Sequence, residues 1–287
     1  MATETDTSRR HTDAESVPWP QQVRSFAVRS TRTIVRDRSA LFWAFVWPAF
    51  WYVMTSLTFI SAPADASNPA QELGYAKAGT AISIGVFGAM SVSLIVLGTR
   101  LSADRTERRY RMLRTLPVSP SADLTGRFLA TFAFSIASFC TIVAISLVDG
   151  ALYPVAGPLA VPVVLGCLLG VCLTSAGVSV VLAEVVRRRE YVVAVGTVGL
   201  LVWFFFSGFN GGVPSLLPEQ ARHLLNIVPN TVGTRTITSH LIGTPLPSDP
   251  QPPGAAVALA TVLGWGGLGY GLGVAVATRS IYDRGGR

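Results

Sequence analysis

The densest group of charged side chains lies in one short stretch, "DRTERRYRMLRTLPVSP", which covers residues 104–120. Five arginines are interleaved there with Asp104 and Glu107, and long apolar runs lie on both sides. Arginine beside an apolar run is suited to binding anionic lipid headgroups or an acidic surface of a partner protein. The chemistry that this stretch indicates is therefore docking at a membrane surface.

The usual signatures of enzyme sites are missing from the sequence. The only lysine, Lys77, stands between two alanines, so the Gly-x-x-x-x-Gly-Lys-Ser/Thr loop that binds ATP phosphates is absent. No Gly-x-Ser-x-Gly nucleophile elbow occurs either. The histidines are His11, His223 and His240, each isolated in sequence. We therefore expect no catalytic residue, no metal site and no cofactor bound by this chain.

The cysteines give no sign of metal chemistry. They lie inside apolar runs without the close pairing that metal sites use. We expect them to be small packed residues. They are Cys140, Cys167 and Cys172.

Composition places the chain in a membrane. It has 287 residues, of which 50% are hydrophobic and only 14% charged, with a mean hydropathy of +0.47. Soluble domains carry about 25% charged residues. Apolar runs of roughly 20 residues recur, and each is long enough to cross a hydrocarbon core about 30 Å thick. The fold class that follows is an all-α polytopic membrane protein.

Six apolar runs predict six membrane spans. Their centres lack ionisable residues, which disfavours an ion- or proton-coupled carrier. Glycines four residues apart, such as Gly166 with Gly170 and Gly267 with Gly271, predict close packing between spans, as does the pair Gly269 and Gly273. The predicted spans cover residues 40–61, 79–99, 125–148, 158–183, 191–209 and 254–278.

The distribution of arginine sets the orientation. Basic-rich connections alternate with basic-poor ones along the whole chain, and the net charge is +7. Because basic loops stay on the cytoplasmic side, both termini are expected in the cytoplasm. Residues 1–20 are expected to be a disordered tail, residues 21–280 a single transmembrane domain, and residues 281–287 a short cytoplasmic tail.

Residues 21–38 predict an amphipathic helix before the first span. Phe26 belongs to an apolar face, and three arginines occupy the opposite face. We expect the helix to lie in the headgroup region with its apolar face toward the bilayer. Plain membrane anchoring and a functional contact are both open. The three arginines are Arg29, Arg32 and Arg36.

The segment 210–253 is too long and too apolar for a simple outer loop. Pro218 opens "PEQARHLLNIVP", which has the pattern of a short helix. A second helix is expected in "NTVGTRTITSHLI", after Pro229 and with Asn230 as its cap. Both are shorter than a span, so we expect outer-leaflet or re-entrant helices. Pro214 begins the same proline-rich stretch.

Placed on a helix, residues 104–116 divide into a face with Tyr110 and two leucines and a face that is mostly charged. Pro117 would end that helix. One alternative is that these arginines only fix orientation and bind anionic lipid. Orientation requires positive charge, but not a two-faced helix with interleaved carboxylates. The candidate docking residues are Asp104, Arg105, Glu107, Arg108, Arg111, Arg114 and Pro117.

Six spans, an amphipathic N-terminal helix and an inner loop ending in "LRTLPVSP" resemble a permease subunit of the ABC-2 type. That family often carries Glu-Arg-Glu-x-Gly-Thr-Leu-x-x-Leu-x-x-Thr-Pro-Val-Ser after its second span. Asp104-Arg105 stands for its acidic-Arg pair, and Leu113 and Pro117-Val118-Ser119 match it, whereas Arg108 replaces the glycine and Arg109-Tyr110 the Thr-Leu. The stretch "SGFNGGVPSLLPEQARHLLNIVPNTVGTRTI" is similar to the family's Gly- and Pro-rich outer segment. The resemblance covers roughly residues 21–280.

The resemblance implies a transporter half. The inner-loop helix would be a coupling helix docked on a separate ABC ATPase that binds the ATP, supported by the N-terminal helix. Two permease chains, identical or different, would pair with two ATPase chains in the plasma membrane. The cargo would be amphipathic, drug-like or lipid-like, as in multidrug efflux, with a polysaccharide or glycolipid as the alternative. A non-ABC channel or a lipid-facing membrane enzyme is the other reading, and no nucleic acid is expected.

Overall fold

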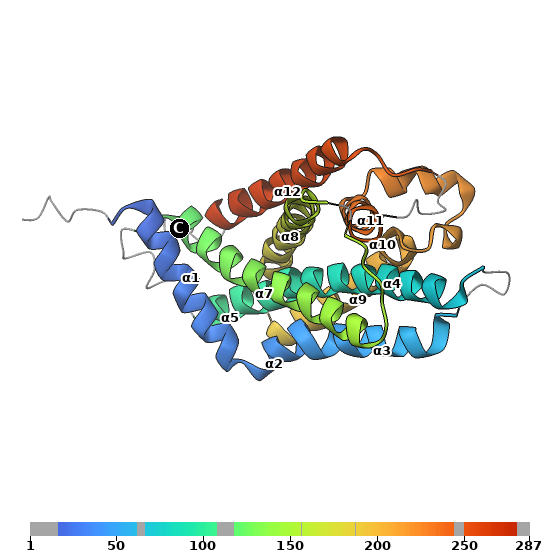
Figure 1. Ribbon diagram of the computed structural model, residues 1–287. Coiled ribbons are helices and arrows are strands. Elements are labelled where there is room, and N and C mark those ends of the chain that lie inside the picture. Colours follow the sequence, from blue (N-terminus) through green and yellow to red (C-terminus); the bar gives the residue numbers. More distant parts are fainter. Residues whose placement is uncertain are drawn as a thin grey trace, which may run out of the picture.

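The computed structural model describes residues 17–61, 67–107, 118–155, 157–186, 188–243 and 250–279. All regular secondary structure in these ranges is helical. Six of the helices are long and apolar enough to cross a membrane, and they pack together in one bundle (Figure 1). The all-α prediction is confirmed.

Each of these six helices overlaps one predicted span. The largest difference is in the second, which runs for 38 residues rather than the expected 21 because its polar ends remain helical. Spans one and two each combine three labelled segments. The spans are α2 (Arg38–Leu41), η2 (Phe42–Val46) and α3 (Trp47–Phe59); α4 (Pro69–Ser91), η3 (Val92–Val96) and α5 (Leu97–Thr106); α7 (Pro120–Val148); α8 (Ala160–Val185); α9 (Arg189–Phe206); and α12 (Ala255–Ala277).

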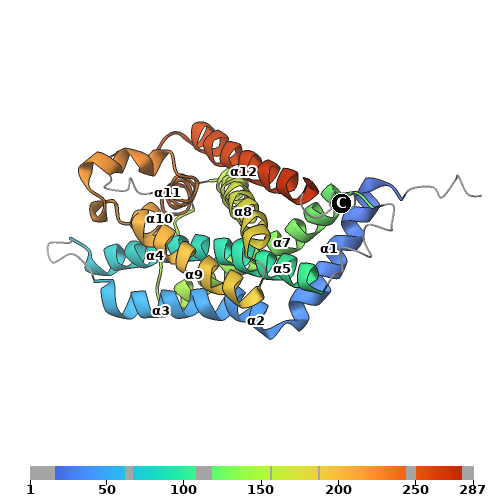
Figure 2. The ribbon, with the colours of Figure 1, turned by 180° about the vertical axis from the view of Figure 1, so that it is seen from behind.

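Span two forms the centre of the bundle. Each span contains an apolar window of 18 residues. That window is 100% buried in span two, but only 22% buried in spans one, five and six. In the two opposite views α4 has α7 on one side and α9 on the other, with α3 running along it (Figures 1 and 2). Spans one, five and six therefore present most of their apolar side chains to the surroundings.

A proline shapes the first span. Pro48 has no N–H to donate to the carbonyl of Ala44, and the helix widens into one π turn just before it. Ser138 of α7 donates a hydrogen bond to that carbonyl instead. Gly88 of α4 lies against the proline ring, where an added Cβ would be 2.9 Å from Pro48 Cγ. The π turn and Pro48 are thus packed on both neighbouring spans.

Glycines bring α8 and α12 into backbone contact. A Cβ at Gly177 would lie 2.1 Å from the carbonyl oxygen of Gly269, and one at Gly170 would lie 2.6 Å from that of Val262. Gly273 also approaches Gly177. The prediction is wrong for Gly267 and Gly271, which face open space because they lie on the opposite side of α12.

The N-terminal helix is α1 (Trp19–Arg36), and it crosses the end of the bundle (Figure 1). Its predicted apolar face exists, but it lies on α7 rather than on lipid. Gly126 of α7 allows this, since a Cβ there would be 2.5 Å from Phe26 Cβ and 2.6 Å from the carbonyl oxygen of Val23. Protein, not the headgroup region, therefore covers the apolar face.

The outer segment contains α10 (Gly208–Gly211), η4 (Pro214–Leu216), η5 (Glu219–Asn226) and α11 (Pro229–Ile242). Both predicted helices are present, the first as a 3₁₀ helix. Asn230 is not the cap of α11: Val228 precedes the helix, and the Asn230 side chain is fully buried. Because α11 is buried against α8, α12 and α4, it is an internal helix and not one at the outer surface.

A left-handed turn joins span five to this segment. The φ angles of four consecutive residues are positive: 64° at Gly208, 54° at Phe209, 54° at Asn210 and 80° at Gly211. Left-handed backbone is costly for residues with a Cβ. Buried hydrogen bonds hold the turn: the Asn230 amide donates to Asn210 Oδ1 over 2.7 Å, and the Asn210 amide donates to the carbonyl of Ser83 over 3.1 Å.

Candidate ATPase-coupling site

The candidate docking residues lie at the C-terminal end of span two, on the side of the bundle that the arginine distribution predicts to be the inner one. Asp104 and Arg105 belong to the last turns of α5, and Glu107 follows the helix end. The two-faced helix therefore does not begin at Asp104, because span two remains helical through Thr106. The other candidates, Arg108, Arg111, Arg114 and Pro117, lie outside the described residues.

Asp104 binds the neighbouring span. Its Oδ2 accepts a hydrogen bond from Arg127 Nη1 of α7 over 2.6 Å, and Arg127 Nε donates to Asp123 Oδ1 over 2.7 Å. The arginine side chain is only 10% exposed, so its charge is balanced by two carboxylates inside the protein. This triad fastens the inner end of α5 to the beginning of α7.

Arg105 binds the inner end of span four. Its Nη2 lies 2.8 Å from Glu184 Oε1, and its Nη1 donates to the carbonyls of Ala183 and Glu184 over 3.1 and 2.9 Å. These carbonyls belong to the last turn of α8, which favours a positive charge. Both Asp104 and Arg105 thus have internal partners, and their role in ATPase contact stays a prediction.

A second group of ion pairs and hydrogen bonds, here called the Asp37 node, centres on the carboxylate of Asp37 between α1 and α2. Its Oδ1 accepts from the backbone N–H groups of Ser39 and Ala40, which caps the start of span one. Its Oδ2 accepts from Arg100 Nη2 of α5 over 3.2 Å and from Arg189 Nη2 of α9 over 3.1 Å. Sequence reasoning missed this residue, although it is the one acidic residue in the basic segment between positions 21 and 39.

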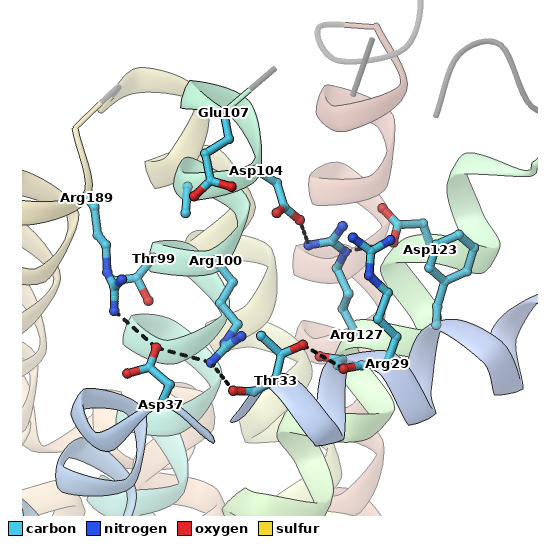
Figure 3. A pocket seen from close by; sticks show the side chains of 13 residues that line it. Arg29, Thr33, Asp37, Thr99, Arg100, Asp104, Glu107, Asp123, Arg127 and Arg189 are labelled. Atoms are coloured by element: carbon cyan, nitrogen blue, oxygen red, sulfur yellow. Dashed lines mark hydrogen bonds and ion pairs between the residues drawn. The ribbon is translucent and has the colours of Figure 1, made fainter. Parts of the chain in front are cut away.

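These groups surround a cavity of about 180 Å³ at the inner end of the bundle (Figure 3). Its wall comes from α1, α5, α7 and the first residue of α9. Among the described residues that line it, four arginines stand with four carboxylates, an arrangement that suits ion pairing between helices. They are Arg29, Arg100, Arg127 and Arg189 with Asp37, Asp104, Glu107 and Asp123.

The predicted interface-helix residues divide between two roles. Phe26 is partly buried against α7, whereas Arg29, Arg32 and Arg36 are exposed. The backbone carbonyl of Arg29 accepts from Thr33 within α1. The three guanidinium groups are accessible to an acidic protein surface or to lipid phosphate.

The outer prolines mark where helices begin. Pro214 opens η4, Pro218 directly precedes η5, and Pro229 opens α11. The fixed φ of proline and its missing N–H suit the first turn of a helix. Their role is therefore to shape the outer segment.

An outer ion pair joins three spans. Lys77 Nζ of α4 lies 2.9 Å from Asp149 Oδ1 at the end of α7, and Tyr52 of α3 donates to Asp149 Oδ2 over 3.0 Å. Burial would raise the pKa of Asp149, but hydrogen bonds from Ser56, Lys77 and Tyr52 outweigh it and hold that pKa below its ordinary value. The only lysine therefore fastens the outer ends of spans one to three.

The remaining candidate ligands are dispersed. Within the described ranges, no three His, Cys, Asp or Glu side chains come together in a group that could hold a metal ion. Cys167 and Cys172 are buried free thiols, and Cys140 is an exposed one. His240 Nδ1 lies 2.9 Å from the carbonyl of Thr236 within α11.

Comparison with known families agrees with this architecture. A family model described as ABC-2 type transporter matches residues 21–242, which is most of the chain and runs from α1 to the last residue of α11. The chain belongs to the ABC-2 type transporter family. Among curated proteins, no sequence matches it. As an ABC-2 membrane domain it is a multi-pass permease subunit of an ABC transporter, and its family implies an ABC ATPase as partner.

Proposed function

We propose that this chain is the permease subunit of an ATP-driven exporter, powered by a separate ATPase that docks at the inner end of span two. The observation that carries this proposal is the set of ion pairs around Asp104, Arg105 and Arg100. They connect α5, which leads into residues 108–117, with α7, α8, α1 and α9. A displacement delivered to that end of α5 is therefore passed to four other helices.

Burial would resist the movement least at spans one, five and six, and of these, spans one and five are linked to α5 through Asp37. Only 22% of the apolar window is buried in each, against 100% in span two. Large apolar side chains project from both, including Phe50 and Leu57 of α3 and Phe206 of α9, which are 52%, 78% and 80% exposed. These surfaces are suited to a second permease chain, to lipid and to an amphipathic or lipid-like cargo. We propose that two copies enclose the transport path between them.

This apolar wall favours an amphipathic cargo over a polysaccharide. A path for a sugar chain requires polar groups and ring faces accessible to water. The exposed side chains of α3 and α9 are mainly aliphatic and phenylalanine. We place both termini in the cytoplasm of a cell whose plasma membrane holds the complex, because the arginine-rich connections lie at that end.

Purification of the chain with its ATPase tests the proposal. Reversing two charges, Arg108→Glu with Arg111→Glu, should abolish co-purification and ATP-dependent export of a fluorescent amphipathic dye from cells. Arg38→Glu is the control, since this exposed arginine belongs to α2 and is not part of the inner loop sequence. Normal association and normal export in the double variant would exclude the coupling role. Ion conduction by the purified chain without ATP would favour the channel alternative.

A further inference from the structure

The carboxylate of Asp37 links the predicted inner ends of spans one, two and five. Docking of an ATPase at the end of span two would not by itself require this link. The carboxylate receives donors from the start of span one, from span two and from span five, as Figure 3 shows for the two arginines. These segments are 152 positions apart at their extremes. One side chain therefore fixes the inner ends of three spans relative to one another.

The two carboxylate oxygens have separate tasks. Oδ1 caps α2 by accepting from the N–H groups of Ser39 and Ala40, while Oδ2 accepts both guanidinium groups. The backbone of Asp37 is extended, with φ −99° and ψ 103°, and so separates α1 from span one. Arg100 also donates to the carbonyl of Thr33 in α1 over 3.0 Å. The node thus lies at the joint between the interface helix and the first span.

The spans linked by Asp37 differ in burial, which indicates which of them would move the others. Arg100 belongs to span two, whose most apolar stretch is fully buried and whose end leads into the proposed docking segment. Spans one and five have little buried surface to hold them in place. We propose that Asp37 is a positioning residue that makes spans one and five follow the movement of α5. This inference rests on the proposed function.

Because Arg189 is exposed, its ion pair with Asp37 allows the positioning role to be tested separately from a contribution to folding stability. Its side chain is 46% exposed, and an ion pair with so exposed a group contributes little to folding free energy. Removing that guanidinium should therefore leave the folded protein intact and disturb only the relative positions of the spans. Only Nη2 of Arg189 contacts Asp37, so a lysine at this position keeps the charge and a single donor.

The test measures a distance in the purified permease–ATPase complex in lipid nanodiscs. Spin labels at Ser39→Cys and Arg188→Cys report the inner ends of spans one and five, in a background with Cys140→Ser. With only one of the two permease copies labelled, we expect one narrow distance distribution in the parent complex, both without nucleotide and with a non-hydrolysable ATP analogue. Arg189→Gln should lose the narrow distribution when the analogue binds, whereas Arg189→Lys and the neighbouring control Arg38→Gln should retain it.

Asp37→Asn provides a second variant, because asparagine still caps α2 but has no charge for the arginines. It should broaden the distribution as Arg189→Gln does, with a thermal unfolding midpoint equal to that of Arg38→Gln. A narrow distribution in both variants overturns the role of Asp37, as does a distribution in the parent complex that broadens with nucleotide. Failure of any ATPase to co-purify instead refutes the proposed function, and the inference with it.

Discussion

Replacing Gly177 with alanine should destabilise the protein by separating α8 from α12. The new Cβ would lie 2.1 Å from the carbonyl oxygen and 2.3 Å from the carbonyl carbon of Gly269. These are backbone atoms of a helix, so they cannot rotate away as a side chain could. Ordinary contact needs roughly 3.5 Å. The two helices must therefore move apart by more than about 1 Å at this level.

The size of the effect follows from two opposing terms. Overpacking of this kind costs about 1–3 kcal/mol. Alanine returns up to about 1 kcal/mol through its higher helix propensity. The neighbouring contact of Gly273 with Gly177 would be lost as well. We expect a net loss of about 1–2 kcal/mol, which corresponds to a fall of roughly 2–8 °C in the unfolding midpoint.

Size-exclusion chromatography of detergent-solubilised protein after heating measures this midpoint. Gly267→Ala is the matched control: it is in the same α8–α12 pair, but its Cβ would meet no atom within 4 Å. It should not lower the midpoint. Equal midpoints for the two variants would refute the backbone contact, because they would show that a methyl group is accommodated equally on both sides of α12.

Substitutions at three further positions test other contacts. Asp149→Asn should lower the unfolding midpoint above about pH 4 and not in stronger acid, because a carboxyl whose pKa is held below its ordinary value contributes stability that disappears as pH falls through that lowered pKa; a pH-independent difference would contradict this. Asn210→Gly should cost about 1 kcal/mol less than Asn210→Ala, since both lose the amide bonds but glycine adopts a positive φ freely, and equal unfolding midpoints would argue against a left-handed turn. Arg235→Met should speed hydrogen exchange in η5 but not in α8, because the buried guanidinium donates to Asn226 and to the carbonyl of Pro250; unchanged exchange would show that these bonds do not hold η5.

The spans could be predicted because their length is a property of each segment alone. An apolar run either reaches across the hydrocarbon core or does not, whatever it packs against. The bounds of span two were missed because Pro69 and Asn68 start its helix in polar sequence, before the apolar run begins. The helical period of α1 was likewise a local property, and it was predicted correctly.

Partners could not be predicted in the same way, since they depend on which segments meet. Arginine on α1 indicates a membrane surface, and the packing of its other face on protein depends on α7, where Gly126 allows the close approach. Asp104 and Arg105 fit a docking motif, yet Arg127 and Glu184 bind them. The spacing of Asp123 and Arg127, one helical turn apart, was a usable signal. For Asn230, the usable signal was an amide side chain among small residues in an apolar segment, which predicts a buried, hydrogen-bonded position.

The burial of α11 constrains the order in which the chain can be assembled. Its neighbours α4 and α8 precede it in the sequence, but α12 follows it. During synthesis α11 therefore leaves the ribosome before α12, one of the helices that bury it, has been made. Its buried polar side chains, among them Asn230 and Arg235, cannot be left facing lipid. Span six therefore completes the protein surroundings of α11. A chain that stops before residue 254 should leave these polar side chains exposed to lipid and be degraded by membrane quality control.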